Sequence, residues 1–390
     1  MSSVIRSLFI ASLATASLLF APVFAADDVK AALDAVSALE KDKRYDEILA
    51  RLEPFEAAPT AEVAFRIAWA RYLRAIDGAH QQGIDRDAVL AAAEWAEKAR
   101  ARGSVPAPNL LYMIYNNGAG VPQDRDKALA YLREGVSRGD AGAKSNYAVL
   151  LYRGEPGVPR DRALAGKYFV ELARGDVVVP AVYYYLGVMR YRGENVKKDT
   201  TEGMRLIRFA AERGDAEAQR DVAKGYEFGW VGKEDLHQAL AWYQKSADNG
   251  DGDAQWRIGM AFVNGEERKA DPAQAVEWFK RSAESRSTQG MTSLAVMYAT
   301  GEGVKQDWNR ARELYEEAAE GGEAHALLNL SGMYLRGEGV DADPVHGFVL
   351  LSQAARMGDE QAVSLKPMVA KELSAEQLAE AERRLRQMAD

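Results

Sequence analysis

Two interleaved series of glycines constrain the fold of this chain more than any other feature of its sequence. The steps within the first series are 36 residues, except for one step of 39, and each member of the second series from Gly139 onward follows a member of the first by 21 residues. The first series is Gly118, Gly154, Gly193, Gly229, Gly265, Gly301 and Gly337, and the second is Gly103, Gly139, Gly175, Gly214, Gly250, Arg286, Gly322 and Gly358. A fixed period of this length predicts a repeat protein.

The residues between the glycines predict helices. Ala, Leu, Glu, Arg and Lys are abundant, and only 12 prolines interrupt the 390 residues. Because a left-handed residue after the last helical turn is easiest for glycine, two glycine series indicate two helix ends per repeat. The predicted fold is therefore all-α, a right-handed α-α superhelix (solenoid) of stacked helical hairpins. Arg286, in place of a glycine, predicts either another cap or strain of about 1 kcal/mol.

Each predicted hairpin carries small and apolar residues at helical spacing on both of its helices. The pattern predicts a stripe on each helix that is buried between neighbouring helices, with alanine allowing close approach and an aromatic residue filling the next groove. Two such stripes are Ala218, Val222, Ala223 and Tyr226 on a first helix and Ala239, Trp242, Tyr243 and Ala247 on a second helix. The three extra residues of the long step are predicted at 176–180, between Gly175 and Gly193.

The repeat pattern resembles that of a known family. It reads Ala-x3-Leu-Gly-x2-Tyr-x2-Gly-x-Gly-Val, followed by Ala-x2-Trp-x3-Ala-Ala-x2-Gly, and is similar to the Sel-1-like repeat family, whose members are related to tetratricopeptide repeats. The best copies begin at Leu294 and at Leu330. On this resemblance we predict seven repeats within 104–358. Divergent hairpins are expected to form an N-terminal cap over 28–103, with helical segments near 28–43, 45–57 and 61–77, and capping helices are expected over 359–390.

The N-terminus predicts export. Residues 1–25 combine one charge at Arg6, an apolar run from Leu8 to Phe20, and small residues at Val23 and Ala25. This is the pattern of a secretory signal peptide, and the apolar run is shorter than the roughly 20 residues that a membrane anchor needs. We expect cleavage near Ala25 and a periplasmic or secreted bacterial protein. Its formal charge of −8 comes from interspersed residues, which disfavours nucleic acid as a partner and adds no membrane-surface patch.

The sequence contains no pattern that indicates catalysis. The four histidines fall on different elements, the chain has no cysteine, and no Gly-x-Ser-x-Gly, Walker or His-x3-His pattern occurs. The prediction is a chain that is not an enzyme and that has no catalytic, cofactor-binding or metal-binding residues. The family resemblance implies a scaffold for other proteins or peptides in the cell envelope. Two alternatives remain open: a cell-wall or carbohydrate binder, and a hydrolase of the β-lactamase or peptidoglycan-active type.

A candidate partner-binding surface follows from the resemblance to tetratricopeptide arrays, which line their concave face with the first helix of each repeat. The corresponding positions in the central repeats carry aromatic and basic residues, which are enriched at protein interfaces. The predicted patch comprises Tyr184, Tyr191, Arg220, Lys224, Trp256 and Met260. The alternative is that these side chains take part in ordinary packing between repeats.

Overall fold

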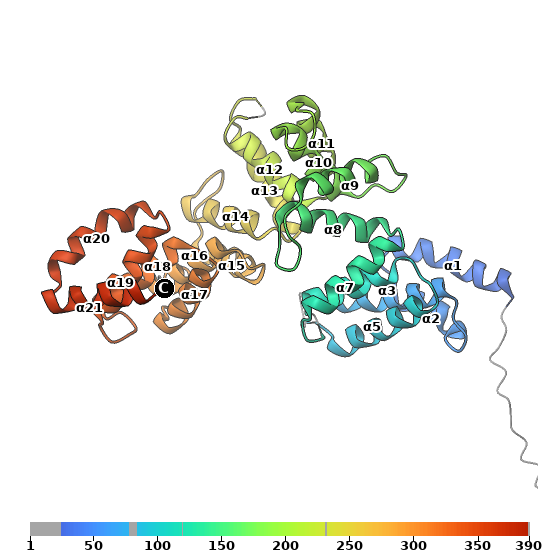
Figure 1. Ribbon diagram of the computed structural model, residues 1–390, viewed down its shortest axis with the longest axis horizontal. Coiled ribbons are helices and arrows are strands. Elements are labelled where there is room, and N and C mark those ends of the chain that lie inside the picture. Colours follow the sequence, from blue (N-terminus) through green and yellow to red (C-terminus); the bar gives the residue numbers. More distant parts are fainter. Residues whose placement is uncertain (1–24, 78–83, 119, 231, 389–390) are drawn as a thin grey trace, which may run out of the picture. The chain divides into compact units, whose positions relative to one another are not determined.

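The computed structural model describes residues 25–77, 84–118, 120–230 and 232–388 (Figure 1). Every regular element in these ranges is a helix, so the predicted all-α class of stacked hairpins is confirmed. The predicted signal peptide, apart from Ala25, lies outside the described residues. Within the described ranges, no helix has both the length and the apolar character that crossing a bilayer requires.

The chain forms two compact units, of which the first ends at Tyr168. In the first unit each helix packs mainly against the next one along the chain. Its N-terminal core includes the fully buried side chains of Val36, Ile48 and Ile67, so the segment before the repeats is folded on the same principle as the repeats. The helices of this unit are α1 (Ala26–Lys41), α2 (Tyr45–Leu52), the short η1 (Glu53–Phe55), α3 (Ala61–Asp77), α5 (Arg86–Ala101), α6 (Ala107–Asn117), α7 (Arg125–Ser137) and α8 (Ala141–Arg153), and α9 (Arg162–Leu172) runs across the division.

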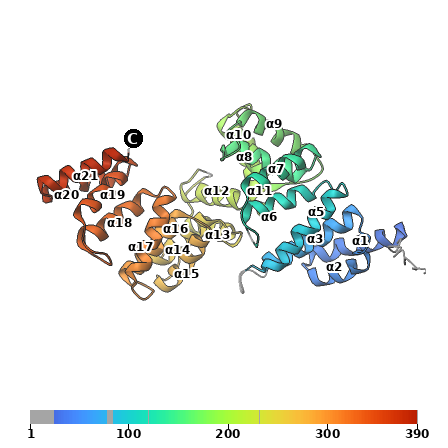
Figure 2. The ribbon, with the colours of Figure 1, turned by 60° about the horizontal axis from the view of Figure 1, so that its bottom comes forward.

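The second unit begins at Phe169 and contains five hairpins in register. The helices of a hairpin pack closely on each other, and the second helix of one hairpin packs on the first helix of the next (Figures 1 and 2). A sixth pair of helices closes the unit. The helices are α10 (Pro180–Arg192), α11 (Thr200–Glu212), α12 (Ala216–Glu227), α13 (Leu236–Asp248), α14 (Gly252–Asn264), α15 (Pro272–Glu284), α16 (Thr288–Thr300), α17 (Trp308–Glu320), α18 (Ala324–Arg336), α19 (Pro344–Arg356), α20 (Glu360–Glu372) and α21 (Ala375–Gln387).

The predicted stripes form the core of the hairpins. On α12, Ala218, Val222 and Ala223 are buried, and on α13 Tyr243 and Ala247 are buried with them. Trp242 packs at the edge of this cluster, half-buried, with the Lys245 ammonium 3.9 Å from the ring centroid. Burial of apolar surface at about 25 cal/mol per Å² is thus shared between neighbouring repeats, so a single hairpin would keep only part of it.

Glycine ends the helices as predicted, with one exception. The seven members of the first series have φ between +64° and +76°. Six of the glycines in the second series also have positive φ, and Arg286 adopts the same left-handed conformation with φ +60°. Gly175 is the exception: its φ is not positive, because α9 ends early at Leu172 and the chain continues through a longer connection before α10. The prediction of a left-handed cap at Gly175 is therefore wrong.

The three extra residues of the long step lengthen the connections on both sides of α9. Asp161 accepts a hydrogen bond from the Leu164 N–H at the start of α9, and it lies seven residues after Gly154, whereas Asp124 follows Gly118 by six. One extra residue is therefore in the loop before α9, and the other two precede α10. Pro180 is the first residue of α10, and Val177 and Val178 in the connection before it are exposed.

The second glycine of the Gly-x-Gly-Val loop lets each loop contact the preceding hairpin. A Cβ atom at Gly303 would overlap the backbone of Pro272, the first residue of α15, and one at Gly339 would overlap Trp308, the first residue of α17. Asn195 and Glu267 occupy the same loop position with φ of +56° and +52°. The loop backbone is thus kept in repeats that lack the glycine.

The final helices close the array unevenly. A capping box of Ser374 and Gln377 starts α21, where the Ser374 side chain accepts from the Gln377 N–H and the Gln377 side chain accepts from the Ser374 N–H. α21 packs on α19, to which α20 also packs. The outer side of α20 is less polar than a capping helix usually is, because Val363 and Met368 are exposed.

Candidate protein-interaction surface

Tyr184 and Tyr191 of the predicted patch lie on the same helix, α10, in different environments. Tyr184 is buried, and its hydroxyl donates to Asp221 Oδ2 on α12 at 3.0 Å. Burial raises the pKa of Tyr184, which keeps the hydroxyl protonated and able to donate. Tyr191 lies seven residues later on the same helix and is 42% exposed. Tyr184 therefore connects two hairpins, while Tyr191 is available at the surface.

Arg220 and Trp256 make contacts within the array. The Arg220 guanidinium lies 2.5 Å from Asp251 Oδ2 and 3.3 Å from Asp253 Oδ2. Asp251 also caps α14 by accepting from the Ala254 N–H. Trp256 donates through its indole N–H to Ser293 Oγ at 2.9 Å. These contacts give both side chains a structural role between successive hairpins.

Met260 and Lys224 are half-buried, and they too differ in their surroundings. Met260 packs against the large C-terminal apolar cluster. Lys224 lines a pocket, and Tyr191 lines the same pocket. The structure therefore brings two of the six predicted residues to one cavity, and it gives Tyr184, Arg220, Trp256 and Met260 contacts within the fold.

This pocket, which we name the α10–α12 pocket, has a volume of about 400 Å³. Its size is within the range of ligand sites in proteins, roughly 300–1,000 Å³. Its walls come from three consecutive helices and from the loop after α12. The lining residues are Val188, Tyr191 and Arg192 of α10, Met204 and Ile207 of α11, Asp221, Lys224 and Gly225 of α12, and Trp230 of the loop.

Asp221 is the only carboxylate among these lining residues, and it already has a hydrogen-bond partner in Tyr184. Burial raises the pKa of Asp221, and the Tyr184 hydrogen bond and the charges of Arg220 and Lys224 oppose that rise. The two cations of the pocket differ in their partners. Arg192 is 58% exposed, and its guanidinium lies 3.7 Å from Glu194 Oε1. Lys224 forms no ion pair within the described part of the chain. The pocket lining therefore carries two cations, Arg192 and Lys224, and one carboxylate, Asp221.

The prediction missed two aromatic residues beside this pocket. Phe228 and Trp230 are 55% and 66% exposed, and their rings stack with centroids 5.3 Å apart. A sequence signal for them existed. The loop of this repeat, Phe-Gly-Trp-Val-Gly, departs from the pattern in which a glutamate follows the first-series glycine, as in Glu194, Glu302 and Glu338.

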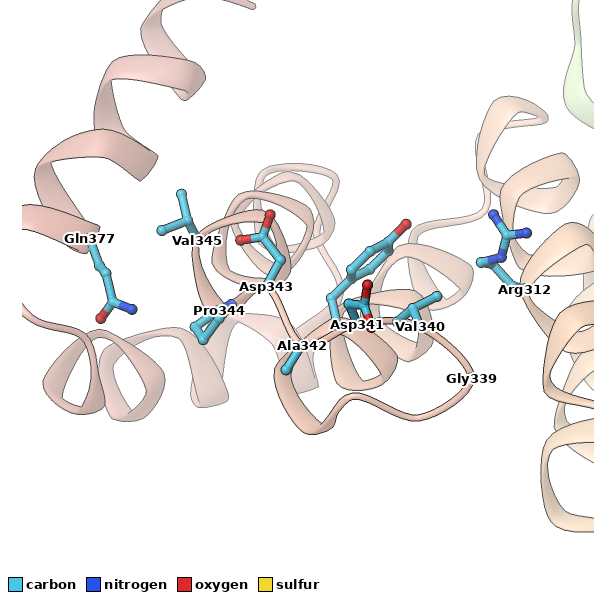
Figure 3. Close-up of a pocket in the computed structure, with 10 residues that line it drawn as sticks. Arg312, Gly339, Val340, Asp341, Ala342, Asp343, Pro344, Val345 and Gln377 are labelled. Carbon is cyan, nitrogen blue, oxygen red and sulfur yellow. The ribbon is translucent and has the colours of Figure 1, made fainter.

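A second and larger pocket has a volume of about 660 Å³ and lies near the end of the second unit (Figure 3). Figure 3 shows Asp343, Pro344 and Val345 at the start of α19, with Gln377 of α21 and Arg312 of α17 at opposite sides. In the preceding hairpins, the Gly-x-Gly loop of the next repeat covers the corresponding helix start, as Gly339 covers Trp308. The pair α20–α21 has no such loop, so we attribute this pocket to the end of the array.

The histidines of the described ranges lie apart from one another. No group of three or more His, Asp or Glu residues there is arranged to hold a metal ion. His237 and His325 are near separate acidic partners, Glu267 and Asp359, and His346 packs edge-on against Tyr334 with centroids 4.5 Å apart.

Hairpins in register, left-handed caps and loops that pack on the preceding repeat define a protein of the α-hairpin repeat, or solenoid, class. The chain belongs to the Sel1 repeat family, since the sequence model of the Sel1 repeat matches well over half of it. Eight segments match, one more than the seven repeats predicted, and the additional one is the first. The segments are 71–104, 113–140, 141–176, 180–215, 216–251, 252–287, 288–323 and 324–359.

The chain is similar to solved structures, one of which supports the same fold. A Sel1 repeat protein from Oxalobacter formigenes is 26% identical, with a TM-score of 0.51 over 65% of this chain and 99% of that one. A protective antigen of uropathogenic Escherichia coli with an SLR fold is 21% identical, with a TM-score of 0.40 over 91% of this chain and 94% of that one. None of the curated proteins matches the chain.

Proposed function

We propose that this chain is a non-enzymatic scaffold that is exported to the bacterial envelope and holds partner proteins on its repeats. Sel1 repeats generally mediate contacts between proteins, and the family membership carries that much to this chain. The observation that most supports a partner site here is the α10–α12 pocket, because it combines an apolar floor with exposed aromatic and basic side chains. These are the residue types that dominate binding energy at protein interfaces.

The proposal of an envelope location depends on the predicted signal peptide. The first helix, α1, begins at Ala26, directly after the expected cleavage site. Removal of residues 1–25 would therefore leave every described helix complete. This agreement supports an exported mature protein.

Site-specific photocrosslinking in cells tests the scaffold proposal. A photoreactive phenylalanine analogue at Tyr191 is expected to give discrete adducts with partner proteins, since this side chain is exposed beside the pocket. The matched control is Arg208, which is exposed on the neighbouring helix α11 and does not line the pocket. No protein adduct at Tyr191, or the same adducts at both positions, would contradict the proposal.

The alternative of a cell-wall binder is separated by sedimentation. Purified peptidoglycan is expected to leave the protein in the supernatant. Co-sedimentation that disappears in a Tyr191→Ala variant, together with absent protein adducts, would favour the cell-wall alternative over the scaffold.

A further inference from the structure

We infer that the α10–α12 pocket binds a partner polypeptide through an aromatic or long aliphatic side chain that is adjacent to a carboxylate. This inference rests on the proposed scaffold function and adds the chemistry of the bound segment. It is carried by three observations: an internal departure from the repeat pattern, an exposed aromatic pair, and a lysine without an ion-pair partner.

The pocket exists because one repeat lacks a side chain that the others have. The position four residues before the first-series glycine holds Met189, Ala261, Met297 and Met333 in other repeats, and each of these side chains is buried. The repeat 216–251 has Gly225 there, on the pocket wall. A glycine in a helix interior costs roughly 0.5–1 kcal/mol relative to alanine. The fold of this repeat thus gives up both packing and helix stability at the point where the pocket opens.

The rim of the pocket also departs from the repeat pattern. Trp230 replaces the glutamate that follows the glycine in most repeats, and Phe228 occupies a position that is polar or charged elsewhere, as in Arg192, Asn264 and Arg336. Both rings are more than half exposed and stack on each other. Because each such aromatic side chain can bury about 150–250 Å², the pair gains most when a partner covers it.

The charges near the pocket favour an anionic group in the bound segment. Lys224 forms no ion pair in the described residues, whereas the carboxylates around it are engaged. Glu227 accepts from the Tyr243 hydroxyl and pairs with Arg257 at 2.7 Å. Asp221 accepts from Tyr184. A carboxylate on the partner would give Lys224 a charge-assisted hydrogen bond, which is roughly twice as strong as a neutral one.

The floor of the pocket distinguishes a peptide from a sugar. It is formed by Val188, Met204 and Ile207, which offer methyl and thioether groups and no hydrogen bonds. A buried hydroxyl without a partner costs about 1–3 kcal/mol, and a sugar would place several of them there. An apolar side chain meets no such cost, so we assign the pocket to a polypeptide.

Binding of two peptide pools tests the inference. Both pools consist of short peptides with blocked ends and mixed flanking residues; one has a fixed Phe-Glu pair and the other a fixed Phe-Lys pair. Titration calorimetry with the full-length chain is expected to show binding of the Phe-Glu pool about ten-fold tighter than binding of the Phe-Lys pool, the size of effect that one charge-assisted contact gives.

Two variants locate the binding. Gly225→Met restores the side chain present in Met189, Met297 and Met333 and should fill the pocket. It is expected to weaken binding of the Phe-Glu pool by at least about ten-fold, without lowering the thermal midpoint. Lys224→Glu is expected to remove the preference for the Phe-Glu pool. Its matched control is Lys233→Glu, which makes the same charge change at an exposed loop residue outside the pocket lining.

Several outcomes would overturn the inference. The inference would be wrong if the two pools bound equally, or if a folded Gly225→Met variant kept its binding. It would also be wrong if the chain bound chitotetraose and neither peptide pool. If Gly225→Met fails to fold, the Lys224→Glu comparison still decides. Protein adducts at Tyr191 without binding of either pool would leave the scaffold proposal standing and remove only the assigned peptide chemistry.

Discussion

At the scale of single residues, the left-handed positions show how this repeat tolerates variation. Glycine occupies most of them, but Asn195, Glu267 and Arg286 adopt positive φ as well. The backbone of the hairpin therefore outweighs the local preference of these residues, since hydrogen bonds and packing on both sides fix the turn. Arg286 is exposed just after the end of α15, where its backbone N–H donates to the Ala283 carbonyl oxygen at 2.8 Å.

Arg286→Gly is expected to increase the free energy of unfolding by about 1 kcal/mol, because a left-handed conformation costs an L-residue roughly 1–2 kcal/mol and glycine loses part of that gain in the unfolded state. Urea denaturation followed by circular dichroism measures the change. The reciprocal control is Gly250→Ala at the same position of the preceding repeat, where a Cβ meets no atom within 4 Å. That variant should lose about 1 kcal/mol; a loss in both variants would refute the strain argument.

At the scale of helices, polar contacts fix the register between hairpins. Arg257 on α14 pairs with Glu227 of α12 and with Glu266 of the following loop, both at 2.7 Å. Burial tends to raise the pKa of Glu266, but hydrogen bonds from Asn264 and Arg257 outweigh it and lower the pKa overall. Aspartate side chains also cap the helix starts. Asp124, Asp199, Asp235, Asp271, Asp307 and Asp343 cap second helices in the same way.

Arg257→Met is expected to cost about 3 kcal/mol, since it leaves two poorly solvated carboxylates without their cation. Thermal unfolding of the two proteins at neutral pH gives the difference. Arg208→Met removes a guanidinium from an exposed position of α11 and should change stability by less than about 0.5 kcal/mol. Similar effects of the two substitutions would show that the Arg257 pairs contribute nothing specific.

The last hairpin is expected to lose stability in mild acid through His346. Burial is the main cause that lowers the pKa of His346, and the charge of Arg384 acts in the same direction. The carboxylates of Asp343 and Glu316 oppose this shift without cancelling it. Because the folded-state pKa lies below the unfolded value of 6.5, protonation favours unfolding. The contribution of neutral His346 is complete above that value and is lost as the pH falls through the folded-state pKa.

The measurement is the thermal midpoint from about pH 7.5 to about pH 5.5. His346→Gln, which installs the residue of Gln238 and Gln274 at this position, should show a smaller decrease than the unmodified protein. His237→Gln, at a side chain that is 77% exposed, is the matched control. An unchanged slope for His346→Gln would mean that this histidine does not contribute to the pH dependence.

At the scale of the whole molecule, each compact unit is a series of hairpins in which most helices contact their neighbours in sequence. Stability is then distributed along the array, and a substitution is felt chiefly in its own repeat and in the adjacent ones. This arrangement allows one repeat, 216–251, to carry a pocket and exposed aromatic residues without loss of the register elsewhere. The protein can therefore specialise one repeat for binding.

Export would determine whether the folded protein contains residues 1–25. In a bacterial host the mature protein is expected to begin at Ala26 and to fractionate with the periplasm, because residues 1–25 have the charge, apolar run and small residues of a signal peptide. Intact-mass spectrometry of the fractionated protein measures this. Replacing Val23 and Ala25 by Asp should prevent cleavage. Recovery of the uncleaved chain from the unmodified gene would contradict the prediction.

Much of the fold could be predicted from the sequence because the repeat states the same information several times. Glycine spacing predicted the helix ends, and the alanine and aromatic stripes predicted the buried faces. The errors fell where the repetition fails. Gly175 precedes the irregular connection to α10, where α9 ends early at Leu172 and no left-handed cap forms.

The candidate site was less accessible to prediction. Position in a repeat identified Tyr191 and Lys224, which line the α10–α12 pocket, but it could not distinguish them from Arg220 and Trp256, which contact Asp251 and Ser293. Those partners lie 31 and 37 residues away. Whether a side chain faces solvent or a neighbour depends on such contacts between repeats, which periodicity alone does not reveal.

The sequence by itself determined the helices, their ends and their order, because these depend on local backbone preferences and on a hydrophobic period that recurs along the chain. The tertiary structure alone decided which polar side chains are satisfied internally and which remain available to a partner. A missing side chain at Gly225 becomes a pocket only when Val188, Met204 and Trp230 surround it, and that arrangement is fixed by the packing of three helices on one another.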